Sequence, residues 1–264
     1  MKKIKRTYIS LFSPLLAVLF LMACKDNDDN IRNNSGEGIT IEETLALTFD
    51  NIVGDQEFLL SDQTYTNQSG EDYEVTELKY IISNIRLTKA DGTVFTYPVD
   101  ESFFVIDEND PTSLQVNLTA IPSGQYTNLK FGFGIDQSRY PIEQGTLNFV
   151  PTAQDKGMLW GWAAGYKFLK MEGNFRANGS DISELFIYHI GSISDTQDNY
   201  KEISLSLSAE STDEITSDIT ITTDVSQVFD AVNTLSLVEK SEIQVDPENS
   251  PKIAENIGEM FSIK

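Results

Sequence analysis

Residues Leu78–Tyr97 read LKYIISNIRLTKADGTVFTY, and this stretch decides the fold class. Apolar residues recur at every second position as far as Ile82. The alternation then resumes with the opposite parity at Ile85, as a β-bulge would cause. An Asp-Gly pair at residues 91–92 favours a tight turn, after which aromatic residues alternate again. The stretch therefore predicts a β-hairpin over residues 80–98.

The same period of two dominates the chain from Ile39 onward. It predicts further strands at residues 45–49, 114–118, 129–133, 166–171, 185–190, 203–207 and 219–221. Helix signals are few. A capping box opened by Asp224 predicts a short helix to about Val232. A second helix is predicted to begin at Ser250-Pro251, with an apolar face formed by Ile253, Ile257, Met260 and Phe261.

Many short strands joined by turns indicate an all-β protein. We expect a single antiparallel β-sandwich with one or two short helices, the last of them at the C-terminus. The hydrophobic share of 40% is sufficient for a packed core and excludes a wholly disordered chain.

The chain is strongly acidic, and its composition excludes several classes of function. It holds 41 Asp and Glu against 19 Lys and Arg, a formal net charge of −22 over 264 residues. Such a polyanion repels phosphate backbones, so we expect no nucleic-acid binding. One Cys and one His exclude an internal disulfide and any metal site that needs two His from this chain.

The N-terminus has the pattern of an export signal. Residues 1–7 are basic, and an apolar run over Tyr8–Met22 ends in Leu-Met-Ala-Cys at 21–24, which resembles a bacterial lipobox. We expect residues 1–23 to be a lipoprotein signal peptide and Cys24 to be the lipidated N-terminus of the mature chain. Loss of the signal peptide removes four basic residues and leaves a net charge of −26. The alternative is an ordinary signal peptide with an incidental Cys.

The residues after Cys24 are short, polar and acidic. Lys25–Asn30 resembles the surface-export signal that many Bacteroidetes lipoproteins carry directly after the lipidated Cys; a plain solvated tether is the alternative. We expect residues 24–38 to be a flexible acidic linker and residues 39–264 to be the folded domain. The predicted location is the outer membrane, with a lipid anchor and exposure at the cell surface.

Motifs of catalysis are absent from the sequence. It contains no nucleophile elbow, phosphate loop, HExxH or dinucleotide fingerprint. A Ser-His-Asp site would have to use His189, but no Ser lies in a recognisable nucleophile context. We therefore expect a protein that is not an enzyme.

The most unusual segment is residues 157–173, GMLWGWAAGYKFLKMEG, which holds both tryptophans. If the segment is extended, Met158, Trp160 and Trp162 project to one side. Large apolar residues at strand spacing are usually core, and that interpretation stays open here.

This segment resembles the signature of the MbnP-like family, named for a methanobactin-associated copper protein. The matching run is Met158-x-Trp160-x-Trp162-x-x-Gly165-Tyr166-x-Phe168-x-x-x-Glu172-Gly173. Further matches fall in the family's order along residues 42–262: Leu78–Asn84, Pro122-x-Gly124-x-Tyr126, Lys130–Asp136, Tyr188–Gly191 and Ile253–Phe261.

The resemblance implies a secreted β-sandwich that binds copper. In relatives a Trp is oxidised to kynurenine, and a di-haem peroxidase-like protein is the implied oxidant and partner. Ring opening converts the indole nitrogen, a poor ligand, into an aniline-type nitrogen that can coordinate Cu(I) beside imidazole.

Transferred by motif, the candidate copper-site residues are His189, Trp160, Trp162 and Met158, with either Trp as the modified one. The methanotroph site uses two His with kynurenine, whereas this chain offers only His189. The alternative role for His189 is a hydrogen-bonded core histidine, because Leu185 and Ile187 share its parity.

Two other functions remain open from the sequence. A surface binding or adhesion module would use Trp160 and Trp162 as an exposed platform for glycan or protein. An acidic-loop calcium protein would use Asp195, Asp198 and Asn199, although these residues do not form a known calcium motif.

Overall fold

A computed structural model of the chain describes residues 42–136, 149–161, 165–193, 197–207 and 218–264. All of these belong to one compact unit, Thr40–Lys264. The predicted signal peptide, the linker with Cys24, and the candidates Trp162 and Asp195 lie outside the described residues. Within the described part, no helix is both long and apolar enough to span a membrane.

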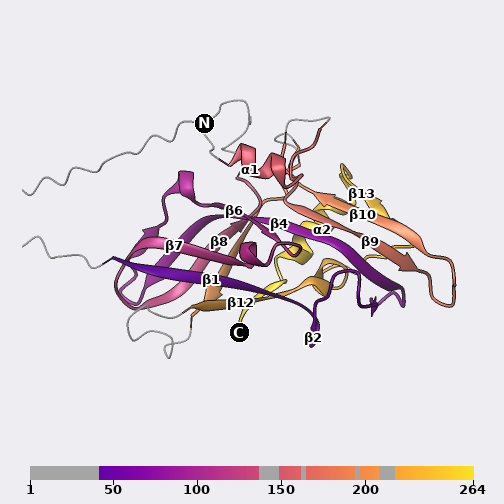
Figure 1. The fold of residues 1–264 in the computed structure, drawn as a ribbon, viewed down its shortest axis with the longest axis horizontal. Helices are drawn as coiled ribbons and strands as arrows, with labels where there is room; N and C mark the ends of the chain where they lie inside the picture. Colours follow the sequence, from indigo (N-terminus) through magenta and orange to yellow (C-terminus); the bar gives the residue numbers. More distant parts are fainter. Residues whose placement is uncertain (1–41, 137–148, 162–164, 194–196, 208–217) are drawn as a thin grey trace, which may run out of the picture. The chain divides into compact units, whose positions relative to one another are not determined.

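Two sheets make up the described fold (Figure 1). The first runs in the order β14-β12-β1-β2, with β7 also paired to β1. Its strands are β1 (Glu42–Val53), β2 (Gln56–Glu57), β7 (Gln115–Pro122), β12 (Ile219–Asp224) and β14 (Phe261–Ile263).

The second sheet is larger and is organised around one long strand, β4 (Asp72–Lys89). Its order is β11-β8-β4-β9-β10-β13, and three short strands also pair with β4. Those three are β3 (Tyr65–Thr66), β5 (Val94–Thr96) and β6 (Phe103–Asp107). The others are β8 (Tyr126–Phe133), β9 (Leu169–Arg176), β10 (Glu184–Ile190), β11 (Lys201–Ser206) and β13 (Glu242–Ile243).

The predicted hairpin and its bulge are confirmed. Strand β4 pairs with β5 across the Asp-Gly turn, where Gly92 adopts a φ of +85° that favours glycine. The register of β4 against β8 shifts between Ser83 and Arg86, and Asn84 within that shift has a φ of +52°. The parity change in the sequence therefore corresponds to a β-bulge, in which strand β4 holds an extra residue.

The β-sandwich class is confirmed, but its strand pairing is mixed. Strand β1 pairs with β12 in parallel, and β10 pairs with β13 in parallel; the other pairings are antiparallel. Parallel neighbours join segments far apart in the chain, and strand periodicity carries no information about that direction.

The helices differ in part from the expectation. The C-terminal helix α2 spans Asn249–Ile257 and packs against β10 and β11, but Phe261 begins strand β14 instead of extending the helix face. Asp224 does cap a helical turn by accepting from Ser226 N, yet the element is a single 3₁₀ turn, η6 (Val225–Val228). Helix α1 (Val150–Asp155) was not predicted. Two further 3₁₀ turns are η1 (Val99–Glu101) and η2 (Pro111–Leu114).

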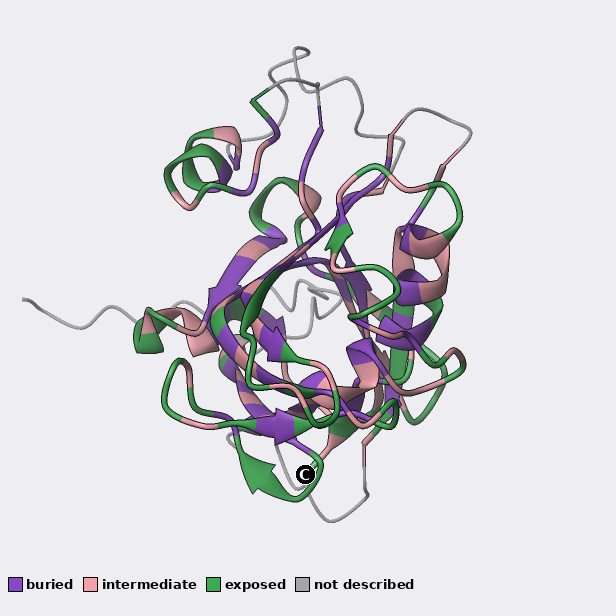
Figure 2. Ribbon diagram, turned by 90° about the vertical axis from the view of Figure 1, so that its right-hand side faces the viewer, coloured by how far each residue is buried: buried purple, intermediate pink, exposed green. Residues whose placement is uncertain are grey.

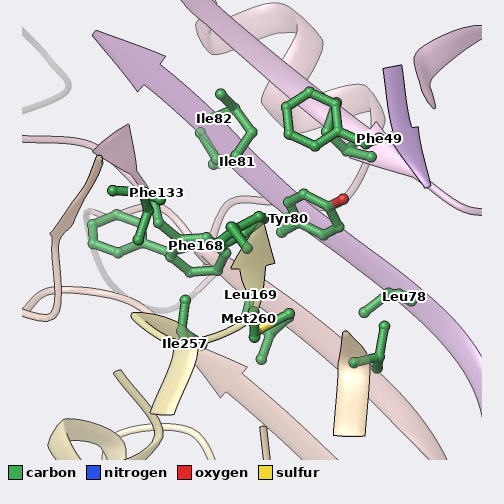
Figure 3. Packing of buried hydrophobic residues seen from close by; sticks show 14 of the residues in the cluster. Phe49, Leu78, Tyr80, Ile81, Ile82, Phe133, Phe168, Leu169, Ile257 and Met260 are labelled. Atoms are coloured by element: carbon green, nitrogen blue, oxygen red, sulfur yellow. The ribbon is translucent and has the colours of Figure 1, made fainter. Parts of the chain in front are cut away.

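Aromatic side chains join the two sheets. Tyr80 of β4 lies between Phe49 of β1 and Phe133 of β8, with ring centroids 6.1 Å apart in both pairs (Figure 3). Figure 2 shows buried residues along the strands, with exposed residues in the turns and also on parts of the strands. The core faces of both sheets are therefore filled, and chemistry has to be sought on the outer faces and in the loops.

Candidate functional site

The Trp-rich segment forms a short ladder that leads into β9. Lys167 N donates to the carbonyl of Met158 at 2.8 Å, and Trp160 N donates to the carbonyl of Gly165 at 3.2 Å. Leu159 and Tyr166 form the bridge between these two bonds. Met158 is fully buried within the hydrophobic core cluster. The shared face predicted for Met158 and the two Trp side chains stays a prediction, since Trp162 is not described.

Trp160 is buried, with 5% of its surface exposed, and its ring lies over two glycines. A Cβ added at Gly165 would lie 3.3 Å from Trp160 Cε3, and one added at Gly191 would lie 2.7 Å from Cη2. At Gly191 the carbonyl oxygen of Tyr166 is closer still, so backbone and indole together exclude a side chain there, whereas the contact at Gly165 is only tight. Because Gly191 follows His189 by two residues, the indole packs against the same short segment that carries the imidazole.

A polar clamp fixes the backbone at Gly191. The side-chain amide of Asn199 donates to the Gly191 carbonyl at 2.9 Å, and Asn199 N donates to Ser192 Oγ at 2.9 Å. Ser192 Oγ in turn donates to Asp198 Oδ1, also at 2.9 Å. Asn199 is 1% exposed. Asp198 and Asn199 therefore serve to hold the loop after β10.

His189 lies near the end of β10, on the outer face of the larger sheet. Its neighbours in the strand at odd positions are exposed or half-buried, with Leu185 70% exposed, whereas Phe186, Tyr188 and Ile190 fill the core. The alternative of a buried, hydrogen-bonded histidine is therefore confirmed, because His189 is only 8% exposed and contacts Glu172; Leu185 and Ile187, which share its parity, are however not core residues.

The imidazole has one polar contact and one buried nitrogen. His189 Nε2 lies 2.8 Å from Glu172 Oε1 of the adjacent strand β9. Within the described residues, Nδ1 is buried and has no hydrogen-bond partner. Burial lowers the pKa of His189, the contact with Glu172 opposes this, and the ammonium of Lys167 adds to the lowering. The imidazole is accordingly neutral at pH 7, the state in which it can bind a metal.

A row of alternating charges crosses the outer face and ends at His189; we call it the outer-face ladder. Its members are Asp110, Lys156, Asp107, Lys79, Glu77, Lys170 and Glu172, in that order. The ion pairs nearest His189 are Lys170 with Glu77 at 2.5 Å and Lys170 with Glu172 at 3.4 Å. Of these residues, sequence reasoning singled out only Glu172, as a member of the family motif and without a role.

Lys167 is not a member of the outer-face ladder. Its side chain is half-buried, and its Nζ donates to the carbonyl of Gly157 at 3.1 Å. Burial lowers its pKa, and the nearby Lys170 lowers it further. Lys167 thus adds positive potential at His189 and favours the neutral imidazole.

The structure also bears on the two other functions predicted from the sequence, the exposed Trp platform and the acidic-loop calcium site. A platform of two exposed Trp side chains is wrong for Trp160, which is buried. Among the described residues, no group of three or more His, Cys, Asp or Glu is placed to hold a metal ion. This finding leaves the acidic-loop calcium hypothesis without a site in the described residues, of which Asp195 is not one.

The fold and site define a class of β-sandwich protein in which a buried imidazole and a buried Trp are joined through the short segment His189–Gly191. Residues 42–248 match the family model MbnP, so the chain belongs to the MbnP family, as its motifs indicated. The structure is similar to MbnP from Methylosinus trichosporium, with a TM-score of 0.51 and 12% identity over 78% of this chain and 82% of that chain. At this identity the likeness shows the fold alone. No curated protein sequence matches the chain.

Proposed function

We propose that this chain is a non-catalytic, copper-binding lipoprotein of the cell envelope. In the proposal His189 and a ring-opened Trp160 supply nitrogen ligands to Cu(I). The observation that carries it is the imidazole of His189, which is buried and whose Nδ1 has no hydrogen-bond partner among the described residues; burial also lowers its pKa and favours the neutral form. The chain belongs to the MbnP family, and this membership supports copper as the metal.

The donor set favours a soft, low-coordinate ion. Neutral imidazole and an aniline-type nitrogen suit Cu(I), whereas Ca²⁺ and Mg²⁺ require several oxygen ligands. An intact indole offers no lone pair for coordination. With only one His in the chain, ring opening of a Trp is therefore a requirement of the proposal. Met158 offers a thioether as a further soft donor, but its side chain is fully buried in the hydrophobic core cluster, so the proposal gives it no ligand role.

Trp160 is the Trp that we propose is modified, because its ring lies against Gly191, two residues from His189. Kynurenine formation breaks the C2–C3 bond of the indole and adds two oxygen atoms, which gives the N-formyl intermediate. Two molecules of hydrogen peroxide balance this step and leave as water. Hydrolysis then removes the formyl group as formate. A di-haem peroxidase-like partner is the proposed catalyst of the oxidation.

The proposed location follows from the N-terminal pattern. Acyl chains on Cys24 would anchor the mature chain in the outer membrane, and the acidic linker after it would carry the domain to the cell surface. Each buried CH₂ group of such chains contributes about 0.8 kcal/mol to anchoring.

Copper titration tests the function. The protein is the mature chain from residue 24 carrying Cys24→Ser, which removes the only thiol, prepared with and without the peroxidase-like partner. We expect about one Cu(I) per chain in the oxidised form. His189→Ala should weaken binding more than about a hundredfold, as expected for loss of a principal ligand.

Ile187→Ala is the matched control, since Ile187 lies two residues earlier on the same face of β10 and has no ligand atom. It should bind copper as the parent does. Equal Cu(I) affinity in the parent and in His189→Ala would refute the proposal.

A further inference from the structure

The contact between His189 and Glu172 fixes more than the position of the ring. The two residues come from adjacent antiparallel strands: Glu172 pairs with Ile187, and His189 pairs with Lys170. Side chains two apart on one strand and on its neighbour meet on the same face of a sheet. The 2.8 Å separation of His189 Nε2 and Glu172 Oε1 is thus set by the register of β9 and β10.

A carboxylate at this distance accepts a hydrogen bond and cannot donate one. The proton of the neutral imidazole therefore resides on Nε2, and the lone pair resides on Nδ1. This is the nitrogen that is buried and has no partner among the described residues. The carboxylate consequently selects which nitrogen is left as a donor atom.

Glu172 is itself held in place. Lys170 Nζ lies 3.4 Å from Glu172 Oε1 and 2.5 Å from Glu77 Oε2, and Lys79 Nζ lies 2.8 Å from Glu77 Oε1. The side chains of both lysines are about 85% buried. Ion pairs that are partly desolvated and joined in a network fix geometry better than isolated surface pairs do.

The charges around this region are balanced. The outer-face ladder contains four carboxylates and three ammonium groups, and its last member, Glu172, faces a neutral imidazole. Lys167 is the additional cation near His189. With Lys167 counted, four ammonium groups face four carboxylates, so the network holds Glu172 in place without an excess of either charge.

We infer that Glu172 is the positioning residue of the copper site: it holds His189 in the Nε2–H tautomer and presents Nδ1 to the metal. This inference rests on the proposed function for the identity of the metal. The selection of the tautomer rests only on the geometry described here. A carboxylate behind a ligating histidine also raises the basicity of the imidazole and limits its rotation.

Nitrogen NMR tests the inference cleanly, because the chain contains one His and yields one imidazole. The ¹⁵N-labelled mature chain with Cys24→Ser is measured at neutral pH, first without metal. We expect the proton on Nε2 in the parent protein. In Glu172→Gln the amide can either accept or donate, so a mixture of the two tautomers should appear.

Copper is then added to the Trp-oxidised protein. Cu(I) is diamagnetic, so the imidazole nitrogens stay observable. In the parent, the Nδ1 resonance should shift while the Nε2 proton is retained. Glu172→Gln should bind Cu(I) about 10- to 100-fold more weakly, as expected for loss of an orienting partner.

Glu202→Gln is the control, because Glu202 also pairs with cations on the larger sheet, Arg86 and Lys130, but has no contact with His189. It should leave both the tautomer and the affinity unchanged. Retained backbone spectra in both variants separate positioning from misfolding.

The outcomes distinguish the two proposals. A proton on Nδ1 in the metal-free parent overturns the inference, whatever copper does. A copper-dependent shift of Nε2 with loss of its proton overturns the inference and leaves copper binding intact. Tautomer selection by Glu172 without any copper-dependent shift overturns the proposed function, and with it the role of Nδ1 as a ligand.

Discussion

The six-membered ring of Trp160 occupies the space that a side chain at Gly191 would need. A Cβ at residue 191 would lie 2.7 Å from Trp160 Cη2 and would also meet the carbonyl oxygen of Tyr166. This contact joins the Trp-rich segment to the loop after β10. It therefore couples the position of the indole to the backbone two residues from His189.

Gly191→Ala should displace the indole and destabilise the fold by about 2 kcal/mol or more, since neither backbone nor indole has room to move freely. Urea unfolding measures the stability. In a Trp162→Phe background, Trp160 is the sole Trp, and its emission should move to longer wavelength. Gly161→Ala is the control, because a Cβ there has no atom within 4 Å. Equal stability of the two variants would contradict the packing described here.

Oxidation should be confined to Trp160. Co-expression with a di-haem peroxidase-like protein should add about 32 mass units to the peptide that holds it, or about 4 after loss of the formyl group. Trp160→Phe should abolish the change, and Trp162→Phe should retain it. Peptide mass spectrometry provides the measurement. The reverse pattern would assign the modification to Trp162.

Glu71 should make stability depend on acid. It is 3% exposed and accepts from Asn67, from Ser236 and from the backbone amides of Leu237 and Val238. Burial alone would raise its pKa, but these hydrogen bonds hold the pKa below the ordinary value of 4.5. A depressed carboxylate pKa contributes stability above pH 4.5 that is lost as the pH falls through the folded-state pKa.

Glu71→Gln should therefore cost about 2 kcal/mol at pH 7, and its difference from the parent should shrink as the pH falls below about 4.5. Chemical unfolding from pH 7 to pH 3 measures both. Glu239→Gln, at an exposed carboxylate close to the same loop, should match the parent at every pH. A difference between Glu71→Gln and the parent that is constant with pH would refute the role given to its charge.

Membrane attachment should depend on Cys24. In cells, the parent chain should sediment with membranes, and Cys24→Ser should not, because the thioether-linked acyl chains are lost. Fractionation followed by immunodetection is the measurement. Protease treatment of intact cells then tests surface exposure. Continued membrane association of Cys24→Ser would reject lipidation as the anchor.

Local pattern was sufficient for much of the fold. The alternation around Tyr80, the parity change before Ile85 and the Asp-Gly turn gave the β4–β5 hairpin together with its bulge. The proline-started helix at the C-terminus was also predicted, as was Asp224 as a cap. These features depend on residues within a few positions of one another, where side-chain direction and turn chemistry act directly.

The short 3₁₀ turn after Asp224 shows where local pattern fails. A capping box predicts where a helix begins, but tertiary packing decides how far it extends. Here Phe229 follows the turn and packs against Tyr73 and Phe186, with ring centroids 4.8 and 6.0 Å apart. The core contact ends the helical run within one turn.

The sequence by itself determined the β class, the family, and the residue types available for soft-metal chemistry, with a single His. Only the tertiary structure decided which face carries His189 and that Glu172 meets its imidazole. It alone also placed the indole of Trp160 over Gly191. The physical reason is register: period-two alternation gives each strand two faces, but pairing between distant strands decides which face is buried and which side chains meet across it.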